Sequence, residues 1–277
     1  MFAKKSPGFN QKPRDNLCRE AMGGGYCKMR FRRKNGIIYL TFANLEQFPE
    51  LTHAVFTRLG GASTPPFDSL NIAGNSGDDP SAVLQNRRTI AGCLGGANMY
   101  YLSQVHGIHI VIPDTNDLNP PEADGAITDK TGIMLVVQAA DCQSVLIYDS
   151  KNKVVANLHA GWKGSTGNII GKCIGIMKSR FNSEPESVLA AIGPSLGPCC
   201  AEFINYKKEI PKQFLQYKDE KNRFNFWQIS HDQLTEGGVP AENIEWANIC
   251  TKCNTHLFFS YRHANETGRF ASVAGLF

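Results

Sequence analysis

The sequence lacks a long apolar run. No stretch approaches the roughly 18 consecutive apolar residues that a membrane-spanning helix needs, and Ile133 to Ala140 is among the longest. The amino-terminal MFAKKSPGFNQKP also has no apolar segment of the kind found in secretory signals. The composition, 42% hydrophobic and 19% charged over 277 residues, is typical of an ordinary soluble globule. We therefore expect a cytoplasmic protein with no membrane partner.

The chain also lacks internal repeats, a Gly-rich dinucleotide fingerprint and a regular alternation of strands and helices. Hydrophobic periodicity predicts helices over 80–94, 166–181 and 226–234. It predicts strands over 37–42, 54–57, 98–105, 108–112, 126–128, 133–147, 154–158, 188–192, 245–249, 257–261 and 271–276. This mixture favours an α+β fold, with mixed β-sheets covered by helices in a single compact domain.

Charge is unevenly distributed along the chain. The net charge is +4, but residues 1–35 contain ten Lys or Arg and two acids, so the remainder is mildly acidic. We expect residues 1–35 to form a basic, disordered arm and residues 36–277 to form a catalytic domain. A nucleic-acid-binding or scaffold role for the arm is an alternative that we do not favour, because the candidate chemistry lies outside it.

Nine cysteines without a secretion signal indicate reduced thiols, which serve in metal binding, catalysis or packing. Cys250-Thr-Lys-Cys253 with His256 is similar to half of a structural zinc site. The other close pair, Cys199-Cys200, is adjacent in sequence and adjacent cysteines make poor chelators. The sequence therefore favours packing roles for these four cysteines.

A predicted hairpin brings a cysteine and a histidine together. If Ser150 and Lys151 form a two-residue loop, then paired residue numbers sum to 301, and Cys142 lies opposite His159. Directly opposed residues have Cβ atoms about 4.5–5.5 Å apart, which suits two ligands of one ion. In this register one face is apolar: Val145, Ile147, Val154, Ala156 and Leu158.

A third candidate ligand is His106, in Gln104-Val-His-Gly107 at the end of another predicted strand. Together, His106, Cys142 and His159 make a His₂Cys set. Such a set leaves one position for water or substrate, as in catalytic zinc sites. The long sequence separations exclude a zinc finger but are compatible with an active site built from strand ends.

Seven short motifs occur in an order that resembles one known family. They are Thr57-Arg-Leu-Gly-Gly61, Ser69-Leu-Asn71, Gln104-Val-His-Gly107, Ala139-Ala-Asp-Cys142, His159-Ala-Gly-Trp162, Ile192-Gly-Pro-Ser195 and Phe259-Ser-Tyr-Arg262. The chain resembles, from about residue 38 onward, the multicopper polyphenol oxidase or laccase-domain family. That family is now viewed as zinc-dependent purine nucleoside phosphorylases with adenosine deaminase activity.

The resemblance implies metal binding by His106, Cys142 and His159, and it implies purine nucleosides and phosphate as substrates. The expected nucleosides are adenosine, inosine, guanosine and 5′-methylthioadenosine. Copper is less suitable than zinc, because a multinuclear copper centre uses more imidazoles than the seven here, in His-x-His pairs that the chain lacks.

Further residues could bind substrate. Arg58 could present a planar fork of donors to phosphate, which makes it a candidate for catalysis together with Cys142 and His159. Asn71 could bind a ribose hydroxyl or cap a turn, and Asp141 is the nearest acid to the three ligands. In a regular strand, however, Asp141 would point away from Cys142.

A rival hypothesis is a metal-free cysteine hydrolase or deamidase, with Cys142 as the nucleophile and His159 as its base. Metal content would separate the two hypotheses, because a bound zinc would occupy the thiolate.

Overall fold

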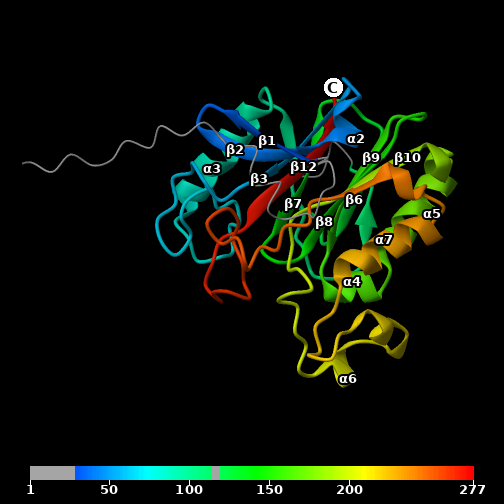
Figure 1. The fold of residues 1–277 in the computed structure, drawn as a ribbon. Coiled ribbons are helices and arrows are strands. Elements are labelled where there is room, and N and C mark those ends of the chain that lie inside the picture. The colour runs from blue at the N-terminus through cyan, green and yellow to red at the C-terminus, as the bar shows by residue number, and fades with distance from the viewer. Residues whose placement is uncertain (1–28, 114–118) are drawn as a thin grey trace, which may run out of the picture.

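Two mixed β-sheets form the centre of the molecule (Figure 1). The structure is a computed structural model that describes residues 29–113 and 119–277. The first sheet has the order β1-β2-β3-β12-β7-β4, with β1 Met29–Lys34, β2 Ile37–Phe42, β3 Leu51–Phe56, β12 Phe270–Leu276, β7 Ile133–Ala139 and β4 Asn98–Tyr100. The second has the order β11-β10-β8-β9-β6-β5, with β11 Ile244–Trp246, β10 Val188–Ile192, β8 Gln143–Asp149, β9 Val154–Ala160, β6 Gly125–Thr128 and β5 Ile110–Val111. Both sheets combine parallel and antiparallel pairs.

Helices cover the outer face of each sheet. On the first sheet, α3 (Pro80–Cys93) buries Ile90 against side chains such as Phe56 and Val136. On the second, α5 (Ile169–Phe181) and α7 (Phe226–Glu236) lie side by side on the opposite flank of the molecule (Figure 1). The described ranges also contain three shorter α-helices: α2 (Ala43–Glu46), α4 (Trp162–Thr166) and α6 (Tyr206–Glu209).

A core between the two sheets joins side chains from both, including Phe42 and Leu135 from the first and Leu146 and Val155 from the second. The layers therefore run helix, sheet, sheet, helix. This confirms the predicted α+β fold with helix-covered mixed sheets. Each sheet is buried on both faces, which explains why most strands read as apolar runs rather than alternating ones.

The predicted strand over 133–147 is two strands in different sheets. β7 belongs to the first sheet and β8 to the second, and the chain crosses between them at residues 140–142. Asp141 has a φ of +91° in this crossover, a conformation that a regular strand excludes. The apolar run gave no indication of the crossover, because both strands are buried.

The predicted hairpin register is wrong by two residues. Paired residue numbers in β8 and β9 sum to 303, so Ser144 rather than Cys142 lies opposite His159, and the loop is residues 150–153. A shift of two residues keeps every side chain on the same face of the sheet. The apolar face, Val145, Ile147, Val154, Ala156 and Leu158, accordingly packs against α5 and α7 as expected.

Two other predictions need correction. The basic arm was expected to extend to residue 35, but Met29–Lys34 forms β1, which pairs with β2, and Arg30 and Arg32 form salt bridges with Glu46. The rest of the predicted arm, residues 1–28, lies outside the described residues. The predicted strand over 257–261 is a buried loop, with Phe258 and Phe259 in the core between the sheets.

No helix within the described ranges is long and apolar enough to cross a membrane.

Candidate metal centre

Three residues from distant parts of the chain converge at one end of the sheets. His106 lies in a loop after β4, Cys142 in the crossover before β8, and His159 near the end of β9. Their possible ligand atoms all lie within 4.8 Å of one another, and the two imidazole rings meet edge to face with centroids 4.8 Å apart. The structure thus brings together the three residues that the sequence singled out.

Asp124 fixes the orientation of this group. Its buried carboxylate accepts a hydrogen bond from His159 Nδ1 at 2.8 Å, which leaves Nε2 available to a metal. It also accepts from the backbone N–H groups of His106 at 2.9 Å and Gly107 at 2.6 Å. Carboxylates that orient ligating histidines are usual around metal sites. Sequence reasoning missed Asp124; the Asp-Gly before a short predicted strand was its only local sign.

Glycine is required beside the three ligands. A Cβ at Gly161 would lie 3.1 Å from Cys142 Sγ and 3.2 Å from His106 Cδ2. Contacts that short would push both side chains out of place. The Gly161 in His159-Ala-Gly-Trp162 is therefore explained by the close approach of the two ligands.

Electrostatics favour a charged sulfur here. Burial opposes ionisation of Cys142, but the neighbouring His159 charge and hydrogen bonds from both imidazoles outweigh it and lower the pKa of the thiol to about 6. Burial likewise opposes protonation of His159, yet Cys142 and Asp124 raise the pKa of its imidazole to about 9. Although burial raises the pKa of Asp124, the hydrogen bonds from His159 and Gly107 lower it further. A metal cation can replace the His159 proton as partner of the thiolate.

The three ligands lie on the wall of a cavity of about 940 Å³. Both sheets contribute to its lining, for example through Gln138 of β7 and Gln143 of β8. Five aromatic side chains also line the cavity: Tyr101, Trp162, Phe203, Phe226 and Tyr261. A cavity of this size, lined by aromatic side chains together with many polar and charged ones, suits a small polar organic ligand.

Arg58 does not line this cavity. Its guanidinium donates to the Asp68 and Thr255 carbonyls at 2.6 and 3.1 Å, and to the Asp68 carboxylate at 3.0 Å. The group also stacks on Phe259 at 4.4 Å. These contacts favour a role for Arg58 in fixing the loops around it, and its binding of phosphate stays a prediction.

Asn71 is fully buried and is also outside the cavity lining. Its amide nitrogen donates to Ser76 and Asp78, and its oxygen accepts from the backbone N–H groups of Ala73 and Arg269. The side chain therefore caps a turn, which was one of the two predicted roles, and its binding of a ribose hydroxyl stays a prediction.

Asp141 does line the cavity. Its two carboxylate oxygens accept from the Thr251 hydroxyl and from the Arg262 backbone N–H, each at 2.6 Å. These bonds tie the crossover to the loop 250–262. A direct contact with substrate stays a prediction.

Two arginines that sequence reasoning passed over do line the cavity: Arg87 and Arg269. Arg87 Nε donates to the Ile72 carbonyl at 2.9 Å, and Arg269 Nη1 donates to the Thr267 carbonyl at 2.8 Å. Neither forms a salt bridge with another residue of 29–113 or 119–277. Burial lowers the pKa of Arg269, while Cys142 and Asp141 counteract that effect. A half-buried cation without a carboxylate partner favours an anionic ligand.

Residues 52–277 match the family model described as multi-copper polyphenol oxidoreductase laccase. The chain belongs to this family. It is 33% identical over 230 residues to "Purine nucleoside phosphorylase YfiH" of Escherichia coli K12, covering 79% of this chain and 91% of that protein. It is 31% identical over 248 residues to "Purine nucleoside phosphorylase YlmD" of Geobacillus stearothermophilus, covering 79% and 88%.

Solved structures of relatives have the same fold. The crystal structure of YlmD from Geobacillus stearothermophilus superposes with a TM-score of 0.81 at 29% identity, covering 89% of this chain and 98% of that one. A YfiH structure from Bacillus licheniformis gives 0.80 at 28% identity, covering 89% and 99%.

Proposed function

We propose that this chain is a zinc-dependent purine nucleoside phosphorylase whose metal ligands are His106, Cys142 and His159. The observation on which the proposal rests is the convergence of these three side chains on the wall of a cavity large enough for a nucleoside. The names of the relatives support the reaction class. The donor set supports zinc, because thiolate and imidazole together suit it and three protein ligands leave one position open.

In phosphorolysis a phosphate oxygen bonds to C1′ of the ribose, the C1′–N9 bond breaks, and the purine leaves with the bonding electrons. Zinc would supply a Lewis acid at the cavity wall. Arg87 and Arg269 would bind and place the phosphate dianion through their planar donor forks. The aromatic side chains would stack on the purine and exclude water. Asp124 would keep His159 in the tautomer that presents Nε2 to the metal.

We extend the proposal to adenosine, inosine, guanosine and 5′-methylthioadenosine as nucleosides, and to deamination of adenosine as a second reaction of the same site. The cavity supports this breadth, since its volume exceeds that of one purine base and its aromatic walls accept any of them. Deamination would replace the exocyclic amine at C6 by oxygen from water and release ammonia.

One observation favours a second candidate function. The pKa of Cys142, lowered to about 6, makes its sulfur a thiolate at neutral pH beside His159, which is also the arrangement of a cysteine hydrolase. The two functions differ in what zinc does. In the phosphorylase, zinc is required and protects Cys142 from alkylation; in the hydrolase, zinc inhibits.

The test is to incubate zinc-replete protein with adenosine, with and without phosphate, and to identify every product. The proposal predicts adenine and ribose 1-phosphate when phosphate is present, and inosine with ammonia in either condition. Base release that is independent of phosphate would refute phosphorolysis. Inosine formation without any base release would support deamination and contradict phosphorolysis.

A further inference from the structure

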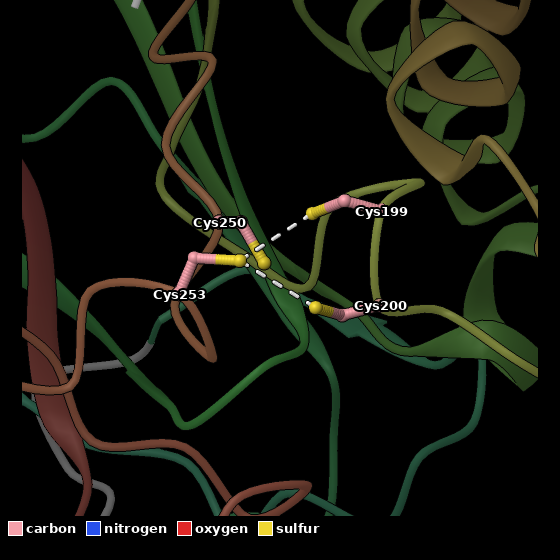
Figure 2. Close-up of side chains that lie close together, drawn as sticks. All are labelled: Cys199, Cys200, Cys250 and Cys253. Atoms are coloured by element: carbon pink, nitrogen blue, oxygen red, sulfur yellow. Dashed lines mark hydrogen bonds between the residues drawn. The ribbon is translucent and has the colours of Figure 1, made fainter.

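A second group of sulfur atoms lies apart from the His106, Cys142 and His159 site. Cys199, Cys200, Cys250 and Cys253 bring their Sγ atoms within 4.8 Å of one another. Figure 2 shows the four side chains converging from two loops, with dashed lines from the Cys253 sulfur to the sulfurs of Cys199 and Cys200. The sequence favoured packing roles for them, but Cys199 and Cys253 are exposed, so packing in a core does not explain the group.

The sulfur separations match a tetrahedral metal site. Cys253 Sγ lies 3.6 Å from Cys199 Sγ and 3.5 Å from Cys200 Sγ. Four thiolates around zinc with bonds of about 2.3 Å have sulfurs about 3.8 Å apart. A disulfide would need about 2.05 Å. The sulfurs are thus at the spacing of ligands that share an ion rather than that of bonded partners.

The backbone holds both loops in position. Ser195 and Cys250 form a parallel bridge, in which the Thr251 N–H donates to the Ser195 carbonyl at 3.0 Å. A Cβ at Gly197 would lie 3.0 Å from Cys250 Cβ, so only glycine permits this approach of the two loops. The cysteine pairs therefore meet without requiring a metal to draw them together.

The adjacency of Cys199 and Cys200 is not an obstacle. The chain turns there, with the N–H groups of Cys200 and Ala201 both donating to the Gly197 carbonyl at 2.9 and 3.0 Å. This turn directs both sulfurs toward Cys253 (Figure 2). Cys250-Thr-Lys-Cys253 has the two-residue spacing common in zinc sites. His256 is not a member of the group.

Nearby charge suits a tetrathiolate zinc, which has a formal charge of −2. Arg223 donates to the Cys199 carbonyl at 3.3 Å, and Lys252 lies between the two cysteines of the second loop.

We propose that Cys199, Cys200, Cys250 and Cys253 bind a structural zinc ion. Four protein sulfurs leave no open coordination position, so the site is structural rather than catalytic. Soft thiolate ligands select zinc over magnesium or calcium.

The position of the site indicates what the zinc stabilises. The first loop continues into Glu202 and Phe203, and the second into Tyr261 and Arg262, all of which line the cavity. Thr251, between the second pair of cysteines, donates to the Asp141 carboxylate, and the Leu196 N–H donates to the Asp141 carbonyl at 2.8 Å. Zinc would therefore join two cavity walls to the crossover that contains Cys142.

The test uses the full-length His106→Ala/His159→Ala variant, which lacks two ligands of the first site, purified under reducing conditions with zinc supplied. We expect one zinc per chain by elemental analysis, and X-ray absorption with four sulfurs at about 2.3 Å. This measurement does not depend on nucleoside turnover, so it stands whether or not the proposed phosphorylase activity is found.

Substitution then locates the ion. Cys253→Ser, at an exposed position, should lose this zinc and have a lower melting temperature, whereas Cys93→Ala, which removes a thiol outside both groups, should retain it. Four freely titrating thiols without zinc would overturn the proposal. So would a disulfide among these cysteines in the reduced preparation, or zinc with nitrogen ligands.

Discussion

Asp124 accepts hydrogen bonds from His159 Nδ1 and from the backbone N–H groups of His106 and Gly107. Asp124→Asn would replace one acceptor oxygen by an NH₂ group that faces other donors. Loss of such an orienting carboxylate typically weakens metal affinity by about 10–100-fold, and we expect that loss at this site. Competition with a chromogenic chelator measures it.

Asp149→Asn is the matched control for Asp124→Asn. Asp149 is also buried and accepts several hydrogen bonds, but it lies at the far end of β8 from Cys142. Its substitution should lower the free energy of unfolding without changing zinc affinity. Equal zinc affinity in the Asp124 and Asp149 variants would show that Asp124 has no role at the metal.

Substitutions at Arg269 and Arg58 distinguish a residue that binds ligand from one that stabilises the fold. Arg269 lines the cavity, whereas Arg58 is committed to Asp68 and Thr255. Arg269→Lys keeps the charge but loses the bidentate fork, and misplacing phosphate should reduce kcat/KM for phosphate on the order of 10²-fold. Arg58→Lys should lower the melting temperature and leave this parameter nearly unchanged. A large loss of kcat/KM for phosphate in Arg58→Lys, with little change in Arg269→Lys, would instead assign phosphate binding to Arg58.

At the level of secondary-structure elements, a substitution just after β9 tests how tightly the metal ligands Cys142 and His106 are packed. Gly161→Ala would place a Cβ within 3.2 Å of side-chain atoms of Cys142 and His106. Overpacking typically costs about 1–3 kcal/mol, so zinc affinity should fall about fivefold or more. Gly175→Ala is the control, because a Cβ on this α5 residue meets nothing within 4 Å. It should stabilise the protein slightly. An unchanged zinc affinity in Gly161→Ala would contradict the geometry.

A buried histidine between β2 and β3 should make the stability of the protein depend on pH. His53 in β3 is buried, its Nε2 accepts from the Phe42 N–H, and burial lowers the pKa of the imidazole to about 4. The unfolded chain, with an ordinary histidine pKa near about 6.5, binds this proton first as pH falls. Stability is therefore complete above that value and is lost towards pH 4, at up to about 1.4 kcal/mol per pH unit.

Denaturant titrations at several pH values check this slope. His53→Gln keeps a hydrogen-bond acceptor but cannot titrate. The slope of the unfolding free energy against pH between pH 6.5 and 4 should therefore decrease by about 1.4 kcal/mol per pH unit, the contribution of one proton. Lost packing around the imidazole ring also lowers stability, and that contribution does not vary with pH. An identical slope in the variant would assign the acid sensitivity to other groups.

Sequence pattern located most elements but not their partners. The apolar face of β8 and β9 was identified even though the predicted pairing was wrong by two residues, because a shift of two preserves sidedness. Pattern could not show that β7 and β8 belong to different sheets, since both are apolar throughout. The apolar run at Leu257 is likewise buried without being a strand.

At the scale of the whole molecule, the residues that escaped prediction are those whose roles depend on tertiary contacts. Asp124 has no local pattern that distinguishes it from a turn residue. Cys199 and Cys253 are far apart in the chain and meet only because the loops around Ser195 and Cys250 pair. His106, Cys142 and His159 were found because each follows or ends an apolar strand and has a metal-binding side chain.

We propose that nucleoside phosphorolysis takes place at the site containing His106, and His109 offers a close control. His109 is three residues away, is exposed, and bonds to the Glu122 carbonyl outside the cavity lining. The decisive measurement is the rate of phosphate-dependent release of hypoxanthine from inosine by zinc-replete wild type, His106→Ala and His109→Ala. We expect similar rates for wild type and His109→Ala, and a loss of orders of magnitude in His106→Ala. Undiminished phosphorolysis by His106→Ala would contradict it.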